Sequence, residues 1–521
     1  MKSIVSVSLS VLLLLTCSCR ENSDPSQPLG SIQIDSVPLE GTVLFLGDSI
    51  THAGHYITDI EAVLRAGGDL ETELINLGLP SETCTGLSEP DHPFPRPNVH
   101  DRIDSALEKV KPDLVFACYG MNDGIYHPFS RDRFAAYQQG IEAIIEKVNA
   151  AGAKLVLMTP PPFDPEPLRA KNKLLPAQTD QDFAWFQIYE SYDTEVLAKY
   201  AEWILQQQGR SDIAGVIDLR SPVLEAVEEG RKADPDFTYS NDGVHLNAEG
   251  HEILSQAILA AFSKTPESPI DSEDRSRIAK KQQILHNAWL SHVGHTRPGV
   301  APGLPLETAR IAAQLVDSGE NPQKLSNGVD LKNWEGDESI WTVEDGMIVG
   351  RNNEPVPSST YLFTKKPYRE FRLIFDVKQT VSPDHSTMHS AVAVLGERFT
   401  DKGDNDFGFK GPLLMFCHDW GIWDAYRRNR IEPAGQKGGL RIEAERKGDW
   451  NRCEVLLKGN RIRFVANGEL VFDFTDDPEM LQKSPIGLQI HSNQRPQEYR
   501  FRGLILCENP GEELVTLGQQ Q

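Results

Sequence analysis

The sequence predicts a multidomain protein in which an α/β/α sandwich with a parallel five-stranded sheet precedes an all-β sandwich of jelly-roll type. The chain has 521 residues, enough for roughly two to four domains. Between residues 41 and 263, short apolar runs alternate with longer helical patterns, as in βαβ units. From residue 325 onward, short alternating strands are separated by turn residues, which is typical of a β-sandwich.

The first residues predict export from the cytoplasm. Residues 1–19 hold a lysine, an apolar run at 11–15 and then Cys19, and polar sequence follows at once, as in a cleaved signal peptide. A cysteine that closes such a segment resembles the lipobox of bacterial lipoproteins, although Thr16 replaces the usual leucine. We therefore expect either a lipoprotein anchored at Cys19, periplasmic or at the outer membrane or cell surface, or a freely secreted protein. Residues 20–40 are polar and predict a flexible tether.

The segment from 41 to 263 predicts the α/β/α domain. Its buried strands are expected at residues 43–46, 73–76, 114–118, 154–158 and 216–219. Its helices are expected near residues 55–66, 98–110, 131–151, 182–208 and 247–262. Open parallel sheets place their sites beyond the carboxyl ends of the strands, so the residues that follow each strand are the candidates for chemistry.

The remaining chain divides into a bridge and a second domain. Residues 264–324 carry two helical patterns and few strand signals, which predicts a helical bridge. Residues 325–510 are expected to form the β-sandwich, and residues 511–521 a tail. The strands of the β-sandwich are predicted at 341–343, 346–350, 371–377, 390–395, 453–457 and 462–467.

Charge and cysteine content narrow the possible partners. The formal net charge of −24 argues against nucleic acid and anionic membrane surfaces, because a phosphate backbone demands a basic patch. A neutral or weakly charged substrate fits better, and membrane contact is expected only through the N-terminal lipid. The five cysteines beyond the leader are scattered and odd in number, so most are predicted to be core thiols rather than disulfides: Cys84, Cys118, Cys417, Cys453 and Cys507.

Three residues predict a nucleophilic site in the first domain. Ser49 follows the first predicted strand, and Asp242 and His245 lie before the last helix of the domain. A serine hydroxyl is a poor nucleophile unless a base lies within hydrogen-bond reach and a third group orients that base. The three-residue spacing lets Asp242 receive the imidazole Nδ1–H while Nε2 faces Ser49, and Gly243 eases the turn between them. Ser49, His245 and Asp242 are therefore the candidate nucleophile, base and orienting acid.

Two further short motifs, around Gly78 and Asn122, predict an oxyanion hole. Gly78 follows the second strand and Asn122 the third, so both are expected beside Ser49. The backbone N–H groups of Ser49 and Gly78 and the side-chain amide of Asn122 can converge on one developing negative charge. Asp48 is expected to brace the nucleophile turn, and Asp123 to support the site from behind.

In these four blocks the chain resembles the SGNH, or GDSL, hydrolase (esterase) family, whose name lists the serine, glycine, asparagine and histidine that stand here at Ser49, Gly78, Asn122 and His245. The resemblance covers roughly residues 41–262. It implies a flavodoxin-like sandwich and a hydrolase acting on ester bonds, since most members are esterases, lipases or deacetylases of carbohydrate or lipid substrates. The mechanism needs no metal, and we expect no cofactor.

The surroundings of these blocks favour a small, carbohydrate-linked ester. The loop 81–97 is rich in proline and predicts a stiff lid beside Gly78. No long apolar stretch suggests a lipase groove, whereas Tyr126, Phe129 and Phe163 suit stacking on a sugar or a small acyl pocket. An acetyl-like group on a carbohydrate or polysaccharide is therefore the expected substrate.

The bridge offers a further group of polar residues. His292, His295 and Arg297 lie within six positions, between its two helical patterns. They either lean over the catalytic crevice and contact substrate, or cap the linker.

The second domain resembles the concanavalin-type (LamG-like) β-sandwich domains of 3-keto-disaccharide hydrolases, through 325–334, 341–346, 487–491 and 499–502. Where that family has a strand containing glutamate, residues 413–420 of this chain read Leu-Leu-Met-Phe-Cys-His-Asp-Trp. A glycan-binding role is therefore at least as well supported as glycosidic cleavage. The candidate sugar-binding residues are Trp420, Trp423, Tyr426 and Arg427. The alternatives are a glycoside hydrolase with an accessory esterase, or a non-catalytic glycan-binding protein.

Overall fold

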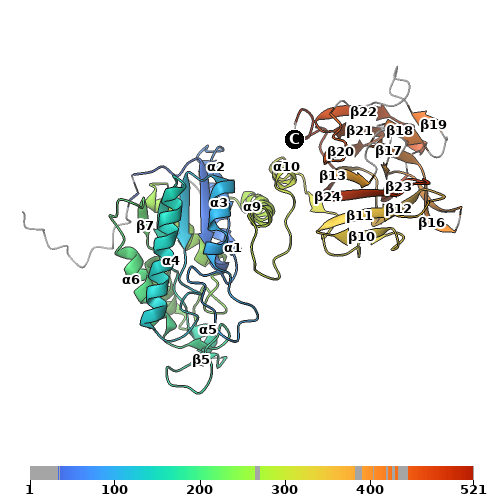
Figure 1. The fold of residues 1–521 in the computed structure, drawn as a ribbon. Helices are drawn as coiled ribbons and strands as arrows, with labels where there is room; N and C mark the ends of the chain where they lie inside the picture. Colours follow the sequence, from blue (N-terminus) through green and yellow to red (C-terminus); the bar gives the residue numbers. More distant parts are fainter. Residues whose placement is uncertain are drawn as a thin grey trace, which may run out of the picture.

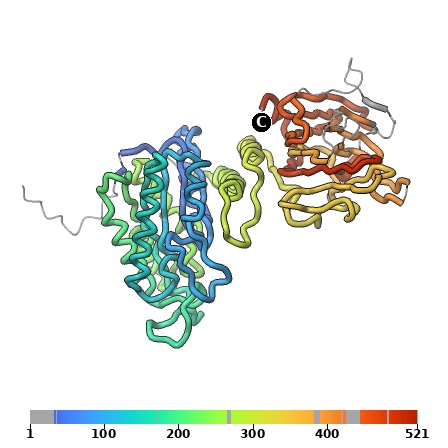
Figure 2. Tube along the Cα trace, in the orientation of Figure 1, coloured from blue at the N-terminus to red at the C-terminus, as the bar shows by residue number. Residues whose placement is uncertain are grey.

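A computed structural model describes residues 33–34, 36–169, 171–264, 270–381, 390–402, 404–417, 421–424, 429–431, 444–480 and 482–519. An α/β domain and a β domain are separated by two helices, α9 (Ser272–Val293) and α10 (Leu306–Asp317), which stand between them in Figures 1 and 2. The predicted signal segment, including Cys19, lies outside the described residues.

The first domain is built on a parallel sheet of five strands. In chain order these are β1 (Thr42–Gly47), β2 (Glu73–Asn76), β3 (Leu114–Cys118), β4 (Lys154–Met158) and β7 (Gly215–Ile217). The spatial order is β2-β1-β3-β4-β7, and every neighbouring pair is parallel. The central strands are buried almost throughout, because helices cover both faces of such a sheet. The predicted parallel five-stranded sandwich is confirmed.

Helices surround this sheet, and Figure 1 shows α3 and α4 side by side on one of its faces. The helices are α1 (Ser49–Ala53), α2 (His55–Ala66), α3 (Ile103–Val110), α4 (Arg131–Ala150), α5 (Glu166–Arg169), α6 (Ala198–Leu205), α7 (Arg220–Ala233) and α8 (Ala248–Ala261), with a 3₁₀ turn η1 (Val99–Asp101) and a π-helical turn η2 (Tyr192–Leu197). Asn247 caps α8 through a side-chain hydrogen bond to the Gly250 N–H of 2.9 Å.

Two sequence expectations for this domain were wrong. The helix predicted at 182–208 begins only at Tyr192, because the aromatic-rich segment before it forms a loop and the strand β6 (Ile188–Tyr189), which pairs with β5 (Leu174–Leu175). The predicted tether is not free along its described part. Ile34 is buried and its N–H donates to the Ala261 carbonyl at 2.8 Å, and Leu39 is also buried.

The bridge shares its core with both neighbours. Asp271 caps α9, and the helix packs against α2, β2 and α10. Trp289 and Leu315 belong to the same buried apolar cluster as the first domain's sheet, and Ile505 of the β domain joins that cluster. A buried ion pair between Arg372 and Glu320, 2.9 Å apart, also ties the β domain to the end of the bridge.

The second domain is an antiparallel β-sandwich, as predicted. One sheet has the order β10-β11-β24-β13-β20-β21-β22 with β8 paired to β24, and the other has β19-β18-β17-β14-β23-β12-β9. The strands of the first sheet are β8 (Gln323–Lys324), β10 (Trp341–Glu344), β11 (Met347–Asn352), β13 (Phe371–Val381), β20 (Asn451–Lys458), β21 (Arg461–Ala466), β22 (Glu469–Thr475) and β24 (Gln497–Glu508). Those of the second are β9 (Trp334–Glu335), β12 (Thr360–Tyr368), β14 (Ser390–Ala393), β17 (Pro412–Phe416), β18 (Gly421–Asp424), β19 (Asn429–Ile431) and β23 (Ser484–Ile490). A small ribbon β15 (Glu397–Asp401) and β16 (Asn405–Lys410) and a 3₁₀ turn η3 (Pro478–Met480) complete the domain.

Two further properties concern the described chain as a whole. The thiols of Cys84, Cys118, Cys417, Cys453 and Cys507 are buried and free, as expected for core thiols. Among the described residues, no helix has both the length and the apolar character needed to span a membrane.

Candidate active site

Ser49 is the first residue of α1, immediately beyond the carboxyl end of β1. Asp48 caps this helix, and its carboxylate accepts a hydrogen bond from the Ile50 N–H at 2.9 Å. Asp48 is itself buried, and burial raises the pKa of its carboxyl to about 7. Its position braces the nucleophile turn. Among the described residues no hydrogen bond occupies the Ser49 N–H, which belongs to the first turn of a helix and is one of its unpaired donors.

The structure brings Ser49, His245 and Asp242 into one chain of hydrogen bonds. His245 Nε2 lies 2.8 Å from Ser49 Oγ, and His245 Nδ1 lies 2.7 Å from Asp242 Oδ2. The second carboxylate oxygen of Asp242 accepts from the backbone N–H groups of Val244 and His245, which fixes the acid in place. Gly243 has φ of +79°, and a Cβ there would stand 2.3 Å from the Asp164 carbonyl oxygen. This turn therefore requires glycine.

The electrostatics of this pair suit a general base. The hydrogen bond to Asp242 raises the pKa of His245 above its usual value, although partial burial opposes the shift. Burial alone would raise the pKa of Asp242, but hydrogen bonds from the His245 side chain and backbone hold it well below the ordinary range. Asp242 thus stays ionised while His245 gains and loses a proton, which is what an orienting carboxylate must do.

Asn122 presents its amide to the same pocket in a fixed orientation. Its Oδ1 accepts hydrogen bonds from Arg96 Nη1 at 3.0 Å and from the Tyr126 hydroxyl at 2.9 Å. One N–H of its Nδ2 donates to the Glu82 carbonyl at 3.2 Å. Because two donors hold the oxygen, the nitrogen keeps its second N–H for another partner, and Asn122 lines the pocket together with Ser49. The geometry suits a donor to an oxyanion.

Gly78 plays a different part from the one expected. Its N–H donates to Asn76 Oδ1 at 2.8 Å, inside the turn that follows β2, so this donor is already engaged. A Cβ at Gly78 would stand 2.3 Å from the His52 nitrogen. The glycine is therefore required by the close approach of this turn to α1, and the free donors at the site are those of Ser49 and Asn122.

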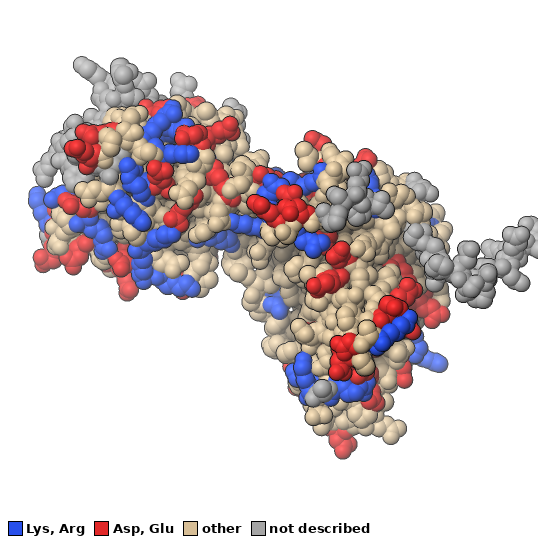
Figure 3. Space-filling model, turned by 180° about the vertical axis from the view of Figure 1, so that it is seen from behind, with Lys and Arg blue, Asp and Glu red and all other residues tan. Residues whose placement is uncertain are grey.

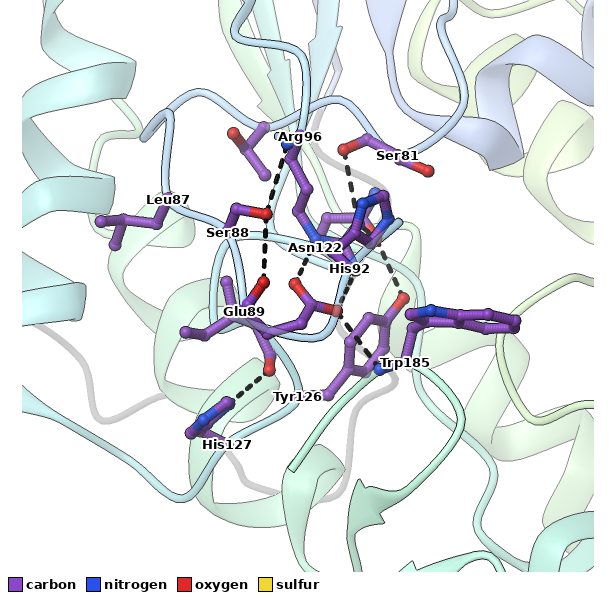
Figure 4. A network of polar contacts seen from close by, with 12 residues as sticks. Ser81, Leu87, Ser88, Glu89, His92, Arg96, Asn122, Tyr126, His127 and Trp185 are labelled. Carbon is purple, nitrogen blue, oxygen red and sulfur yellow. Dashed lines mark hydrogen bonds and ion pairs between the residues drawn. The ribbon is translucent and has the colours of Figure 1, made fainter. Parts of the chain in front are cut away.

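A buried ion pair between Arg96 and Glu89 lies next to Asn122 and contacts it through Arg96, as Figure 4 shows. Arg96 and Glu89 form two hydrogen bonds, both 2.7 Å long, and both side chains are almost wholly buried. The guanidinium of Arg96 also lies 5.5 Å from the centre of the Tyr126 ring. The backbone N–H of Trp185 donates to Glu89 Oε1 at 3.2 Å, which ties a second loop to the pair. Nothing in the sequence pattern singles out Arg96 or Glu89.

Asp123 has the supporting role expected of it. Its buried carboxylate accepts hydrogen bonds from the N–H groups of Cys84 at 2.8 Å and Thr85 at 3.1 Å. These contacts hold the start of the lid loop 81–97 against the domain. Burial raises the pKa of Asp123 to about 6.

A pocket of about 330 Å³ is lined by Ser49, Asn122, Asp242 and His245. This volume is at the small end of the range for small-molecule sites. Lid residues including Phe94 form part of its wall. Trp185 and Phe186, 51% and 38% exposed, add aromatic surface. Of the aromatic residues named from the sequence, Tyr126 lines this pocket, whereas Phe163 lines a neighbouring one of about 180 Å³. Trp185 and Phe186 lie in the segment predicted to be helical, so their role was missed.

The bridge contributes one of its three candidate residues to this pocket. Arg297 lines it and donates from Nε to the Pro80 carbonyl at 3.0 Å. His295 lines a separate hollow of about 270 Å³, and His292 lines a groove of about 1040 Å³ between the bridge and the β domain. Neither Ser49 nor His245 lines that groove.

Only one of the candidate sugar-binding residues of the β domain falls within the described chain. Trp423 stands on β18 and is 37% exposed. Trp420, Tyr426 and Arg427 lie outside the described residues. Within the described part of the chain, no cluster of three histidine, cysteine or acidic residues is arranged to hold a metal ion.

Comparison with known families agrees with both domains. Residues 45–253 match the GDSL-like Lipase/Acylhydrolase family. The first domain is a GDSL-like acylhydrolase. Residues 321–505 match the 3-keto-alpha-glucoside-1,2-lyase-like domain, so the acylhydrolase is followed by a glycosyl-hydrolase-like β-sandwich. No curated protein matches the chain.

Solved structures resemble parts of this chain at low identity. A gut microbial diltiazem-metabolizing enzyme is 18% identical over 45% of this chain and 49% of its own, with a TM-score of 0.34, so the chain spans about half of that enzyme's length. A carbohydrate acetylesterase family member from Sinorhizobium meliloti is 19% identical over 43% of this chain and 99% of its own, with a TM-score of 0.30. A putative glycosyl hydrolase from Parabacteroides distasonis is 21% identical over 37% and 95%, with a TM-score of 0.27.

Proposed function

We propose that this acylhydrolase is an exported carbohydrate esterase that removes acetyl or similarly short acyl groups, and that its β-sandwich binds or acts on glycan. The observation that carries the proposal is the hydrogen-bonded chain from Ser49 through His245 to Asp242 at the mouth of a small pocket. The leader sequence ending at Cys19 supports export, with or without a lipid anchor.

The reaction follows from the geometry of this chain. Ser49 Oγ attacks the ester carbonyl carbon while its proton passes to His245 Nε2. The carbonyl oxygen becomes an oxyanion, which the Ser49 N–H and Asn122 Nδ2 stabilise. His245 then gives its proton to the leaving sugar oxygen as the ester bond breaks. Water then attacks the acyl carbon while its proton passes to His245 Nε2. His245 returns this proton to Ser49 Oγ as the bond between Oγ and the acyl group breaks and the acid leaves.

The size and lining of the pocket support this proposed substrate. A volume of about 330 Å³ holds a small acyl group and part of a sugar rather than a long acyl chain. The exposed rings of Trp185 and Phe186 provide aromatic faces of the kind that stack on pyranose rings. Both features support a carbohydrate ester.

Hydrolysis of p-nitrophenyl acetate, butyrate and octanoate tests the proposal, using the mature protein and Ser49→Ala. We expect acetate to be cleaved best and the variant to lose at least roughly a thousandfold in kcat/KM. Acetylated polysaccharides then become the substrates to compare. Equal activity of the two proteins would contradict the proposal.

The family match of residues 321–505 favours a second activity, cleavage of oxidised glycosides by the β-sandwich. The 3-keto-disaccharide hydrolase family has a glutamate in the strand that corresponds to the stretch beginning at Leu413. In this chain that stretch includes β17, whose residues are buried and include no carboxylate, which argues against cleavage by the β-sandwich. Release of reducing sugar that persists in Ser49→Ala would establish this activity independently of the esterase.

A further inference from the structure

The catalytic pocket contains positive charge without matching negative charge. Arg96, Lys173 and Arg297 line it, whereas the acidic side chain that lines it is Asp242, which is paired with His245. Arg96 is neutralised by Glu89. Arg297 and Lys173 have no carboxylate within 4.0 Å among the described residues.

Arg297 is held in a fixed direction with donors to spare. Its Nε donates to the Pro80 carbonyl and its Nη1 to the Pro298 carbonyl, and its guanidinium lies 5.1 Å from the centre of the Phe94 ring. A guanidinium has five N–H groups, so three remain for a ligand. Burial lowers the pKa of Arg297, as expected for a cation that has lost water without gaining an anion.

This arginine comes from outside the segment that matches the acylhydrolase family. It lies on the loop between α9 and α10, which extends away from both helices in Figure 2, and its contact with Pro80 spans 217 residues of sequence. The family match ends at residue 253. Arg297 is thus a pocket residue that the bridge adds to the domain.

We propose that Arg297 binds a carboxylate of the substrate, assisted by Lys173, so that the ester cleaved at Ser49 is carried by an acidic sugar of the hexuronate class. The planar fork of arginine matches a carboxylate with two parallel hydrogen bonds. Exposed aromatic rings and an uncompensated cation in one pocket suit a sugar ring that bears an acid group. This inference rests on the proposed esterase function.

The overall charge of the protein does not oppose this specificity. The net charge of −24 led to the expectation of a neutral or weakly charged substrate. On the face drawn in Figure 3, however, basic side chains are interspersed with acidic ones over both domains. At physiological ionic strength, exposed charges more than about 8 Å apart are largely screened, so the groups inside the pocket decide which substrate binds.

Matched monoacetylated substrates test the inference: a methyl glucuronide, its neutral methyl ester, the corresponding glucoside and the glucoside 6-sulfate. We expect the wild type to prefer the glucuronide over the two neutral sugars. Arg297→Gln should reduce that preference in kcat/KM by roughly 10-fold to 100-fold, as for loss of a charge-assisted hydrogen bond, with the change mainly in KM. Arg297→Lys should restore part of it. Arg310→Gln, a bridge arginine outside this pocket, serves as the control and should keep the wild-type preference.

The outcomes separate the two proposals. If the wild type hydrolyses none of the substrates, the proposed function fails. If it hydrolyses them through Ser49 without preferring the glucuronide, or if Arg297→Gln lowers all rates equally, the esterase stands and the acidic specificity is overturned. Preference for the sulfate over the glucuronide would show an anion site selective for sulfate and overturn the hexuronate assignment.

Discussion

His286 Nε2 lies 2.8 Å from His52 Nδ1, so the bridge helix α9 contacts the short helix that carries the nucleophile. The other nitrogen of His286 lies 2.7 Å from the Asn76 carbonyl oxygen. A carbonyl can only accept, so Nδ1 of His286 carries the proton and Nε2 accepts from His52. The bridge therefore helps to hold both α1 and the Asn76–Gly78 turn.

Replacing His286 should weaken the fold and the site together. In His286→Phe the buried Asn76 carbonyl loses its partner, and we expect the free energy of unfolding to fall by about 1–3 kcal/mol. His286→Asn, whose amide can take the place of the Nδ1–H donor, should lose less. Urea unfolding and p-nitrophenyl acetate hydrolysis measure both effects. A Phe variant as stable and active as the wild type would show that the contact is incidental.

The pH dependence of activity should follow His245. Because Asp242 raises the pKa of His245 above its ordinary value of 6.5, kcat/KM should fall as the pH drops through that raised pKa, where the base becomes protonated. In Asp242→Asn the acid limb should move to lower pH, and the rate should drop by roughly 10⁴-fold. A pH–rate profile of both proteins checks this. An acid limb unmoved in the variant would assign it to another group.

Much of the fold could be predicted because the buried strands of the parallel sheet have a recognisable pattern of apolar residues in the sequence. A parallel strand covered on both faces is a continuous apolar run, and β1, β3 and β4 are of this kind. Isolated apolar residues have no such pattern. Ile34 and Leu39 stand in a polar segment, so only their tertiary contacts show that they are buried.

The candidate site divides in the same way. Ser49, Asp242 and His245 lie in short motifs at strand and helix ends, which made their meeting predictable. The Glu89–Arg96 pair joins two residues of an irregular proline-rich loop, where no periodicity marks partners. Arg297 reaches the pocket from beyond the domain, so no motif within the domain could reveal it. Gly78 shows the limit of a motif, since its position was foreseen but the engagement of its N–H with Asn76 was not.

The amide of Asn122 should account for much of the rate. Removal of one oxyanion donor costs roughly 10²–10³-fold in kcat, and we expect this loss for Asn122→Ala. Tyr126→Phe removes only one of the two donors that orient the amide, so its loss should be smaller and confined to kcat. Steady-state kinetics on p-nitrophenyl acetate separate the two variants. A larger effect of Tyr126→Phe would mean that its hydroxyl contacts the substrate directly.

His251 on α8 should make the fold sensitive to acid. It is buried, with its ring 5.1 Å from that of His55 and 5.9 Å from that of Tyr56. Burial lowers the pKa of His251 to about 3, and the neighbouring His55 adds to the shift. Below about pH 6.5 the unfolded state binds a proton that the folded state does not, until the pH nears 3. The stability contribution is therefore complete above pH 6.5 and is lost at about 1.4 kcal/mol per pH unit as the pH falls through this window.

Comparison with His251→Phe isolates this group from others of opposite sign. Burial raises the pKa of Asp48 to about 7 and of Asp59 to about 6, so these carboxyls favour the folded state as the pH falls and partly mask the histidine. The variant should gain about 2 kcal/mol over the wild type between pH 7.5 and pH 5, measured by urea unfolding at each pH. Ser255→Ala, one turn further along α8 and without a titratable group, should show a difference from wild type that is the same at both pH values. If the difference between His251→Phe and the wild type is the same at both pH values, as for Ser255→Ala, then folding does not lower the pKa of His251 and the prediction is wrong.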